Sequence, residues 1–250
     1  MPHIYRCTLE LMETTFFSSR EVGAVYQTEP LIGNYALAYA LSFCQAPYQS
    51  AGPPRYSQDL GGLNQRGLYV TPATMQGVPR FTIGEFNAQP ETYWYAMGNN
   101  LLVTRPDQTW AEASVGAWYI IERPGEKGRK LGVENRPQHG RIRYLAIGNR
   151  AIFYVISQQE IIIPRYIRLG KFMSKAKVEA EPIPERLVNL ENQTIDFLLN
   201  PADLPATLTL HFWDTINVPP APLVKNLRCS GAFYQLGRDR YLPAEMAFGL

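Results

Sequence analysis

The 250-residue sequence has few of the residues that build metal and redox sites, since it contains only three cysteines and three histidines. Cys7, Cys44 and Cys229 lie far apart and are odd in number, which predicts reduced thiols rather than a disulfide framework. No close cysteine and histidine spacing indicates zinc, so we expect no metal site. The sequence also lacks the glycine-rich phosphate loops of nucleotide-binding proteins and the common hydrolase and metalloprotease motifs. We therefore expect no cofactor, and enzymatic activity has little support.

Long apolar runs are absent as well. No segment approaches the ~18–20 apolar residues that a transmembrane helix requires, and residues 1–17 alternate polar and apolar side chains instead of forming a signal peptide. Together with the reduced thiols, these absences predict a cytoplasmic chain without a membrane partner. The chain is nevertheless 46% hydrophobic, which is enough to bury a sizeable core, and its length suits one domain with a long insertion.

The net charge of +2 hides a strong asymmetry along the chain. Residues 1–122 and residues 178–250 each carry a net charge of −4, whereas residues 123–177 hold 13 basic and 3 acidic residues, a net charge of +10. A basic centre within an acidic frame favours a polyanionic partner. The plainer alternative is that these basic side chains only make a β-rich surface soluble.

Periodicity predicts an α+β fold. Residues 4–11 alternate as a half-buried strand does, and residues 33–46 show helical spacing with Asn34 as the N-cap. Residues 47–65 are rich in Gly, Pro, Ser and Gln and predict a surface loop, while residues 157–160 match a capping box that predicts a short helix. Aromatic and β-branched runs bounded by Gly, Pro or Asn predict further strands at 67–75, 80–88, 93–104, 116–122, 141–147, 151–157, 207–213 and 230–236, with a hairpin tip or mobile loop at 123–140.

Residues 141–177 combine the two features by which proteins hold single-stranded nucleic acid, which are cations along the phosphates and aromatic faces for the bases. Gly170 would let the backbone approach a phosphate closely. The alternative is that about half of the aromatic residues here, such as Tyr144 and Phe172, belong to the core. The predicted nucleic-acid-binding residues are Arg141, Arg143, Arg165, Tyr166, Arg168, Gly170, Lys171, Lys175 and Lys177.

Three motifs carry a resemblance to a known family. The stretches "NYALAYAL" (34–41) and "PRYIRLGKFMSKAKVE" (164–179) resemble the Cas-five subunit of type I-D CRISPR surveillance (Cascade) complexes. The tail "DTINVPPAPLVKN" (214–226) is similar to the matching part of that subunit. The resemblance runs in order along most of the chain, and the two longer motifs are its most specific part.

The resemblance implies a fold and a role. The fold would be a single ferredoxin-like (RRM-type) α+β domain over 1–250, with a β-rich C-terminal part, a β-hairpin thumb inserted at about 64–140 and a basic RNA-binding segment at about 141–179. The role would be that of a non-catalytic subunit in antiviral defence. It would grip the 5′ handle of the guide CRISPR RNA and contact the large and backbone subunits, near the flanking motif of target DNA.

The sequence departs from the implied pattern in two places. The glycine-rich loop of related RNA-binding repeat proteins is not evident near the C-terminus. The second helix of the RRM pattern is shortened to roughly residues 157–163.

Two other functions fit the same residues. His139 could serve with a nearby tyrosine or lysine, such as Tyr144, in a metal-independent endoribonuclease that processes the guide precursor, although no second histidine accompanies it. In one CRISPR subtype Cas-five proteins do cleave that precursor, whereas type I-D assigns the cleavage to a separate subunit. A pure assembly module would instead place the basic segment against an acidic protein partner.

Overall fold

The computed structural model describes residues 2–22, 25–44, 55–88, 102–104, 110–114, 117–121, 129–130 and 138–249, with side chains described outside 86–139. These residues form two compact units. The main unit comprises residues 1–84 and 142–250, and the second unit comprises residues 85–141. Parts of the predicted strand at 93–104 and of the predicted loop at 123–140 lie outside the described residues.

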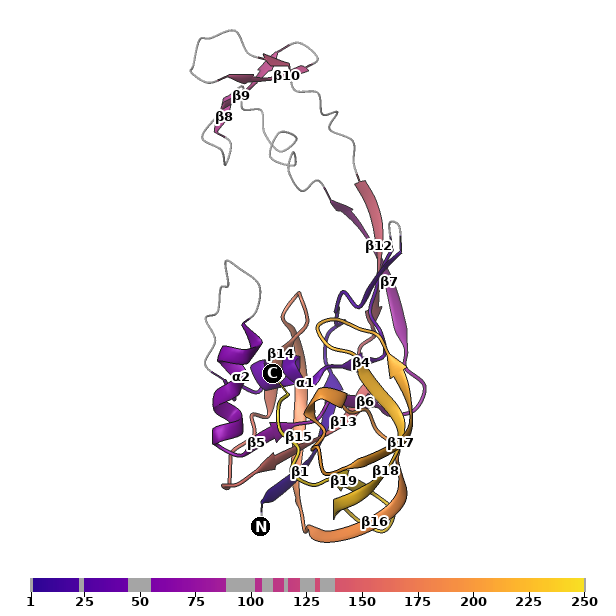
Figure 1. Ribbon diagram of the computed structural model, residues 1–250. Helices are drawn as coiled ribbons and strands as arrows, with labels where there is room; N and C mark the ends of the chain where they lie inside the picture. The colour runs from indigo at the N-terminus through magenta and orange to yellow at the C-terminus, as the bar shows by residue number, and fades with distance from the viewer. Residues whose placement is uncertain are drawn as a thin grey trace. The chain divides into compact units, whose positions relative to one another are not determined.

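A seven-stranded antiparallel sheet forms the framework of the main unit (Figure 1). Its strands follow the order β14-β15-β1-β13-β6-β4, and β5 also pairs with β13. The bounds are β1 His3–Leu11, β4 Leu31–Ile32, β5 Leu68–Val70, β6 Ala73–Met75, β13 Arg150–Ser157, β14 Tyr166–Leu169 and β15 Ser174–Ile183.

The strand predicted at 4–11 is confirmed as β1, and its alternation has the expected cause. Cys7 and Leu9 point into the core with no exposed surface, while Arg6 and Thr8 on the opposite face are only half-buried. The neighbouring β13 differs because every residue from Ala151 to Ser157 is buried, so both faces of this strand are covered. The sheet is therefore enclosed around β13 and open on one face along β1, β15 and β14.

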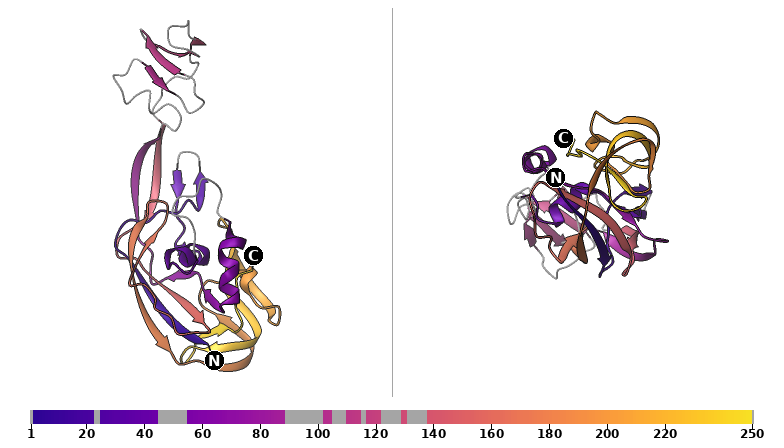
Figure 2. Two further views of the ribbon diagram at one scale, coloured as in Figure 1. Left: turned by 90° about the vertical axis from the view of Figure 1, so that its left-hand side faces the viewer. Right: turned by 90° about the horizontal axis from the view of Figure 1, so that it is seen from below.

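Helices α1 (Asn34–Ala40) and α2 (Tyr56–Gln65) pack on the main sheet, as Figure 2 shows. The predicted helix at 33–46 is confirmed but shorter, since Ser42 adopts a left-handed φ of 58° just beyond its end. Asn34 is not the N-cap, because Gly33 holds that position and the Asn34 amide reaches Asp203 instead.

Two sequence predictions near the helices are wrong. The predicted loop at 47–65 contains α2. The apolar face of this helix is narrow, and its buried residues are Leu60 and Leu63. Two glycines between them hid the helical pattern from sequence reasoning. The capping box at 157–160 does not start a helix, although Ser157 Oγ accepts a hydrogen bond from the Gln159 amide.

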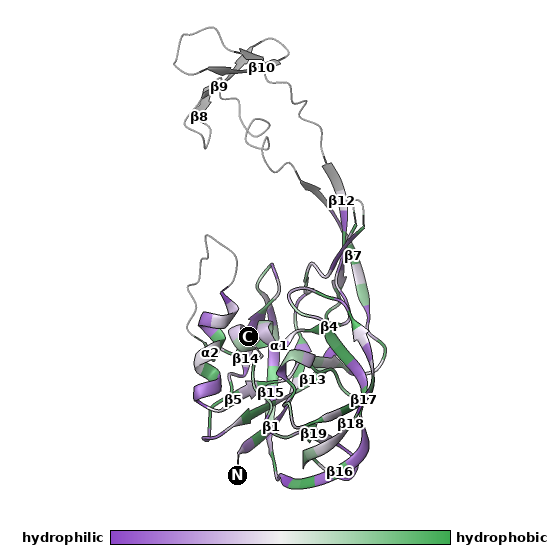
Figure 3. Cartoon of the chain, in the orientation of Figure 1, coloured by the Kyte–Doolittle hydropathy of each residue, from purple (hydrophilic) through white to green (hydrophobic). Residues whose placement is uncertain are grey.

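The C-terminal part is β-rich, as predicted, and packs on the main sheet through one shared core. Phe197 lies against Tyr154 of β13 with ring centroids 5.2 Å apart. Edge strands β16 and β17 mix hydrophobic and hydrophilic residues along their length, as Figure 3 shows. This sheet comprises β16 Arg186–Ile195, β17 Thr209–Ile216, β18 Leu223–Gln235 and β19 Tyr241–Pro243, and a 3-10 helix spans Pro201–Asp203.

The second unit contains an antiparallel sheet of its own, in the order β11-β10-β9-β8. Its strands are β8 Leu102–Thr104, β9 Trp110–Ser114, β10 Ala117–Ile121 and β11 Arg129–Lys130. A further sheet has the order β2-β3-β12-β7, with β2 Arg20–Val22, β3 Val25–Gln27, β7 Phe81–Ala88 and β12 Gln138–Leu145. The described chain is thus mainly β-structure with two short α-helices. Over the described ranges, no helix is both long and apolar enough to cross a bilayer.

Candidate nucleic-acid interface

The hairpin of β14 and β15 gathers most of the predicted binding residues. The strand register places Tyr166 opposite Lys177 and Arg168 opposite Lys175. Residues directly opposite each other in an antiparallel pair point to the same face, so these four side chains form one ladder. Ile167, between Tyr166 and Arg168, is buried and points to the core, which anchors the hairpin and turns the ladder outward.

The turn of the hairpin is fixed by Gly170. Its φ of +71° is left-handed, and a Cβ atom at this position would come within 2.5 Å of the Phe16 carbonyl oxygen. That oxygen accepts a hydrogen bond of 2.9 Å from the Lys171 amide, which docks the turn on the segment after β1. The glycine is therefore required by a close approach to Phe16.

Tyr166 is the exposed aromatic residue of the ladder, with 49% of its surface accessible. The Lys175 ammonium nitrogen lies 4.6 Å from the centre of the Tyr166 ring, and the Arg165 guanidinium carbon lies 5.8 Å from it. Cation–π attraction at these distances orders the ring and the two cations together. An exposed aromatic ring with two cations over it combines the two kinds of group by which proteins hold a base and its adjoining phosphates.

Acidic neighbours neutralise part of the ladder. Arg168 lies 3.6 Å from the Glu13 carboxylate, and Lys177 is hydrogen-bonded to Glu179. The Lys177 hydrogen bond and charge lower the pKa of Glu179, so this carboxylate stays ionised near neutral pH. Arg165 and Lys175 have no carboxylate within ion-pair distance in the described part of the chain, so they are the cations most available to a ligand.

Arg141 and Arg143 lie on β12 rather than on the hairpin. Arg141 is exposed and belongs to the second unit, where it lies 3.3 Å from Glu85. Arg143 has an internal role, because its guanidinium carbon lies 4.4 Å from the centre of the Phe81 ring and its Nη2 donates to the Thr28 carbonyl. The structure therefore groups six of the predicted residues with Gly170 on one hairpin and leaves the two β12 arginines outside it.

Phe172 and Tyr144 form an aromatic cluster beside the hairpin turn. Phe172 stacks on Phe16 with centroids 5.6 Å apart, yet 58% of its surface remains accessible. The Tyr144 ring packs edge-on against the Phe16 ring, with the ring centroids 5.9 Å apart. The alternative that these two aromatics belong to the core therefore does not hold for Phe172, which is at the surface, while Tyr144 is half-buried.

The catalytic alternative at His139 and Tyr144 lies partly outside the described residues. The backbone of His139 lies in β12, but its side chain is outside the described residues. His211 lies on β17, where its Nε2 is 2.7 Å from Ser230 Oγ. No group of three or more His, Cys, Asp or Glu side chains that could hold a metal ion occurs among the residues with described positions.

The sequence matches a family model described as type I-D CRISPR-associated protein Cas5/Csc1, over residues 2–250. The chain belongs to this family. Among solved structures it is similar to a chain in the cryo-EM structure of the Type III-B Cmr-beta bound to cognate target RNA and AMPPnP, state 1. That match has 13% identity and a TM-score of 0.35, and covers 90% of this chain and 86% of the other. These values establish neither a common fold nor a common function, and no curated protein matches the sequence.

Sequence reasoning missed two features of this Cas5/Csc1 family chain. Glu13 lies far from Arg168 in sequence, and although Glu179 ends the quoted motif at 164–179, its pairing with Lys177 was not predicted. The second feature, the buried carboxylate of Asp203 described below, was not predicted from the sequence. The signal that could have indicated it is "NPAD" (200–203), where Asn200 caps a short 3-10 helix through the Ala202 amide.

Proposed function

We propose that this chain is a non-catalytic RNA-binding subunit of a type I-D CRISPR effector complex, and that it holds the 5′ handle of the guide RNA on the β14–β15 hairpin. The observation that carries the proposal is the half-exposed Tyr166 ring flanked by the unpaired cations Arg165 and Lys175. Membership of the Cas5/Csc1 family supplies the context of a CRISPR complex. A guide RNA offers both phosphates for the cations and a base for the ring.

The proposal includes a ferredoxin-like strand arrangement in the main sheet. Strands β15, β1, β13 and β5 are neighbours in that order and are antiparallel throughout. Numbered by their place in a βαββαβ chain, they follow the order 4-1-3-2 that such a domain requires. The helices α1 and α2 lie between β1 and β5 in sequence, as the first helix should, whereas residues 158–165 contain no helix where the second is expected.

We further propose that β17 contacts a neighbouring subunit of the complex, either the large subunit or a backbone subunit. β17 lies at the edge of its sheet, and Phe212 and Trp213 expose 56% and 45% of their surfaces. Exposed aromatic residues on a strand edge are typical of protein interfaces. The basic hairpin would remain free for RNA, with target DNA near its flanking motif as a further contact. The buried free thiols of Cys7 and Cys229 favour a reducing cytoplasm as the site of action.

The proposal predicts that replacing both Arg165 and Lys175 with alanine weakens binding of single-stranded RNA carrying the guide 5′ handle. Two lost phosphate contacts should lower affinity about tenfold near 0.15 M salt and flatten the slope of log affinity against log salt by about 1.4. A fluorescence-anisotropy titration of the full chain at several salt concentrations measures both quantities.

The matched control replaces Arg186 and Arg238, which are exposed and lie in the C-terminal part, with alanine. This variant loses the same charge and should bind RNA with nearly wild-type affinity. RNA recovered after incubation with the wild-type chain in EDTA should be uncut, whereas cleavage that disappears in His139→Ala would favour the endoribonuclease. Equal salt slopes for the wild type and the Arg165 and Lys175 variant would refute the RNA-binding assignment.

A second prediction concerns assembly. Replacing Phe212 and Trp213 with serine should reduce recovery of the other effector subunits at least about tenfold in a pull-down through this chain, because buried aromatic anchors dominate interface energies. RNA affinity of the isolated chain should not change. Val78→Ser, at a separate residue that is 89% exposed, is the control and should assemble normally. Normal recovery with the double variant would exclude β17 from the interface.

A further inference from the structure

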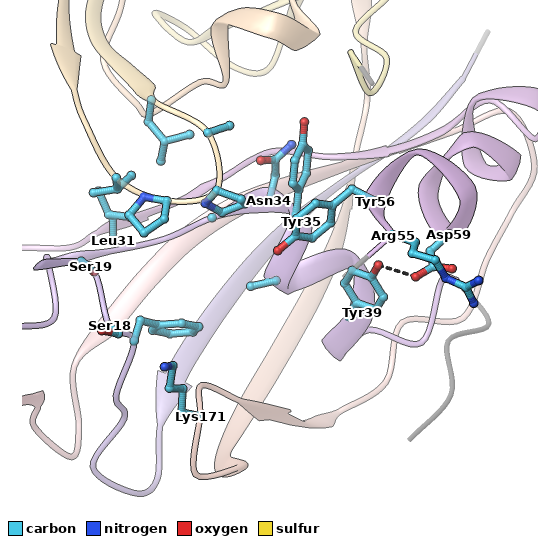
Figure 4. Close-up of a pocket in the computed structure, with 18 residues that line it drawn as sticks. Ser18, Ser19, Leu31, Asn34, Tyr35, Tyr39, Arg55, Tyr56, Asp59 and Lys171 are labelled. Carbon is cyan, nitrogen blue, oxygen red and sulfur yellow. Dashed lines mark hydrogen bonds between the residues drawn. The ribbon is translucent and has the colours of Figure 1, made fainter. Parts of the chain in front are cut away.

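A pocket of about 500 Å³ lies in the main unit, between the hairpin turn and the two helices (Figure 4). A volume of this size suits a small ligand group. Its walls come from α1, the start of α2, residues 17–19 after β1 and residues 218–221 before β18. We call it the tyrosine pocket, and define it by Phe17, Tyr35, Tyr39, Tyr56, Asp59 and Lys171.

Tyrosine rings form the aromatic wall of the pocket. Tyr56 lies against Tyr35 with centroids 5.0 Å apart and against Tyr39 with centroids 6.2 Å apart. The Tyr39 hydroxyl donates to Asp59 at 2.7 Å, and the Tyr35 hydroxyl donates to the Gly249 carbonyl at 3.3 Å. These bonds fix the two outer rings, so the wall is pre-formed.

Tyr56 retains unused binding capacity. Its hydroxyl has no hydrogen-bond partner among the residues that the structure describes, and Figure 4 shows it pointing toward the interior of the pocket. The Asp59 carboxylate at the same wall retains an oxygen that does not bond Tyr39. A donor and an acceptor beside an aromatic face match the edge and the face of a nucleobase.

Lys171 places a positive charge at the opposite side of the pocket. It lies on the turn between β14 and β15, and Figure 4 shows its side chain near Ser18, on the side of the pocket away from Tyr56. Within the described ranges no carboxylate pairs with it. The same turn joins β14 and β15, which carry Tyr166 and Lys175 of the ladder.

We propose that the tyrosine pocket accepts one unstacked base of the bound single-stranded RNA, with Tyr56 against the base and Lys171 on the adjoining phosphate. The inference rests on the proposed RNA-binding function. It adds Tyr56 as a second aromatic contact to the RNA, besides Tyr166. An apolar side chain of a partner protein would also fill the pocket. The uncompensated charge of Lys171 and its place on the basic hairpin favour RNA.

The test combines an abasic scan of the handle RNA with substitution of Tyr56. Abasic RNAs lacking one base at a time are titrated into the full wild-type chain. One position should weaken binding about 10–100-fold, as the loss of one stacked base does. Tyr56→Ala should cause a similar loss with intact RNA and no additional loss with that one abasic RNA, because both changes remove the same contact. Tyr56→Phe keeps the ring and should retain most of the affinity.

Lys171→Ala provides a second variant because this side chain is exposed and its removal leaves the fold intact. It should flatten the salt slope by about 0.7, the effect of one phosphate on a single strand. If the chain binds RNA with the expected salt slope but no abasic position is coupled to Tyr56, the pocket inference is overturned and the proposed function stands. Loss of a copurifying subunit in Tyr56→Ala with unchanged RNA affinity would assign the pocket to a protein. No RNA binding at all would overturn both.

Discussion

Replacing Asp203 with alanine is expected to lower the free energy of unfolding by about 2–4 kcal/mol. Asp203 is 2% exposed and accepts three hydrogen bonds, from Asn34 Nδ2 at 2.6 Å, from the Tyr69 hydroxyl at 2.8 Å and from the Gly249 amide at 2.8 Å. These donors come from α1, β5 and the C-terminal segment, so one carboxyl group ties three parts of the main unit together. Its loss leaves buried donors without partners, which costs more than the bonds themselves contribute.

Urea denaturation of the full chain measures this loss, and Asp196→Ala is the matched control. Asp196 is also an aspartate of the C-terminal part, but it is exposed and lies 3.7 Å from Arg240. An exposed ion pair of this kind contributes little, so the control should change the free energy of unfolding by less than about 0.5–1 kcal/mol. Equal effects of the two substitutions would show that the Asp203 cluster does not stabilise the fold.

The second large effect is a dependence of stability on pH. Burial raises the pKa of Asp203 to about 6, although the bonds from Gly249, Tyr69 and Asn34 partly oppose this shift. An unfolded aspartate has a pKa of about 4. Between these values the folded chain keeps a proton that the unfolded chain has lost. The stability contributed by this group is therefore complete below pH ~4 and is lost as the pH rises through about 6, by about 2–3 kcal/mol.

Comparison with Asp203→Asn isolates this contribution, because the amide is similar in size and does not titrate. Between pH 4 and pH 7 the wild type should lose about 2–3 kcal/mol of unfolding free energy relative to the variant. Denaturant titrations of both proteins in the same buffers give the difference at each pH, which removes the effects of all other carboxylates. A difference that stays constant from pH 4 to pH 7 would contradict a raised pKa at Asp203.

Local patterns predicted much of the framework. The alternation at 4–11 predicted β1, and the apolar run at 151–157 predicted its partner β13. Burial on one face produces an alternating sequence pattern, and burial on both faces produces a continuous apolar run. The helix α2 was not predicted, because its two glycines interrupt the helical pattern of apolar residues. The second helix implied by the resemblance, at roughly 157–163, is absent for a related reason, since a capping box alone does not provide an apolar face to bury.

The sequence by itself determined the family, the concentration of positive charge in residues 123–177 and the presence of Tyr166 among cations. Only the tertiary structure decided which of these side chains remain available to a ligand. Strand register turns Tyr166 outward, Arg143 is held by Phe81 and Thr28, and Arg168 meets Glu13. The physical reason is that burial and ion pairing depend on partners distant in sequence, as Asn34 and Asp203 show across 169 residues. The tyrosine pocket, assembled from five separate segments, is the clearest consequence of that dependence.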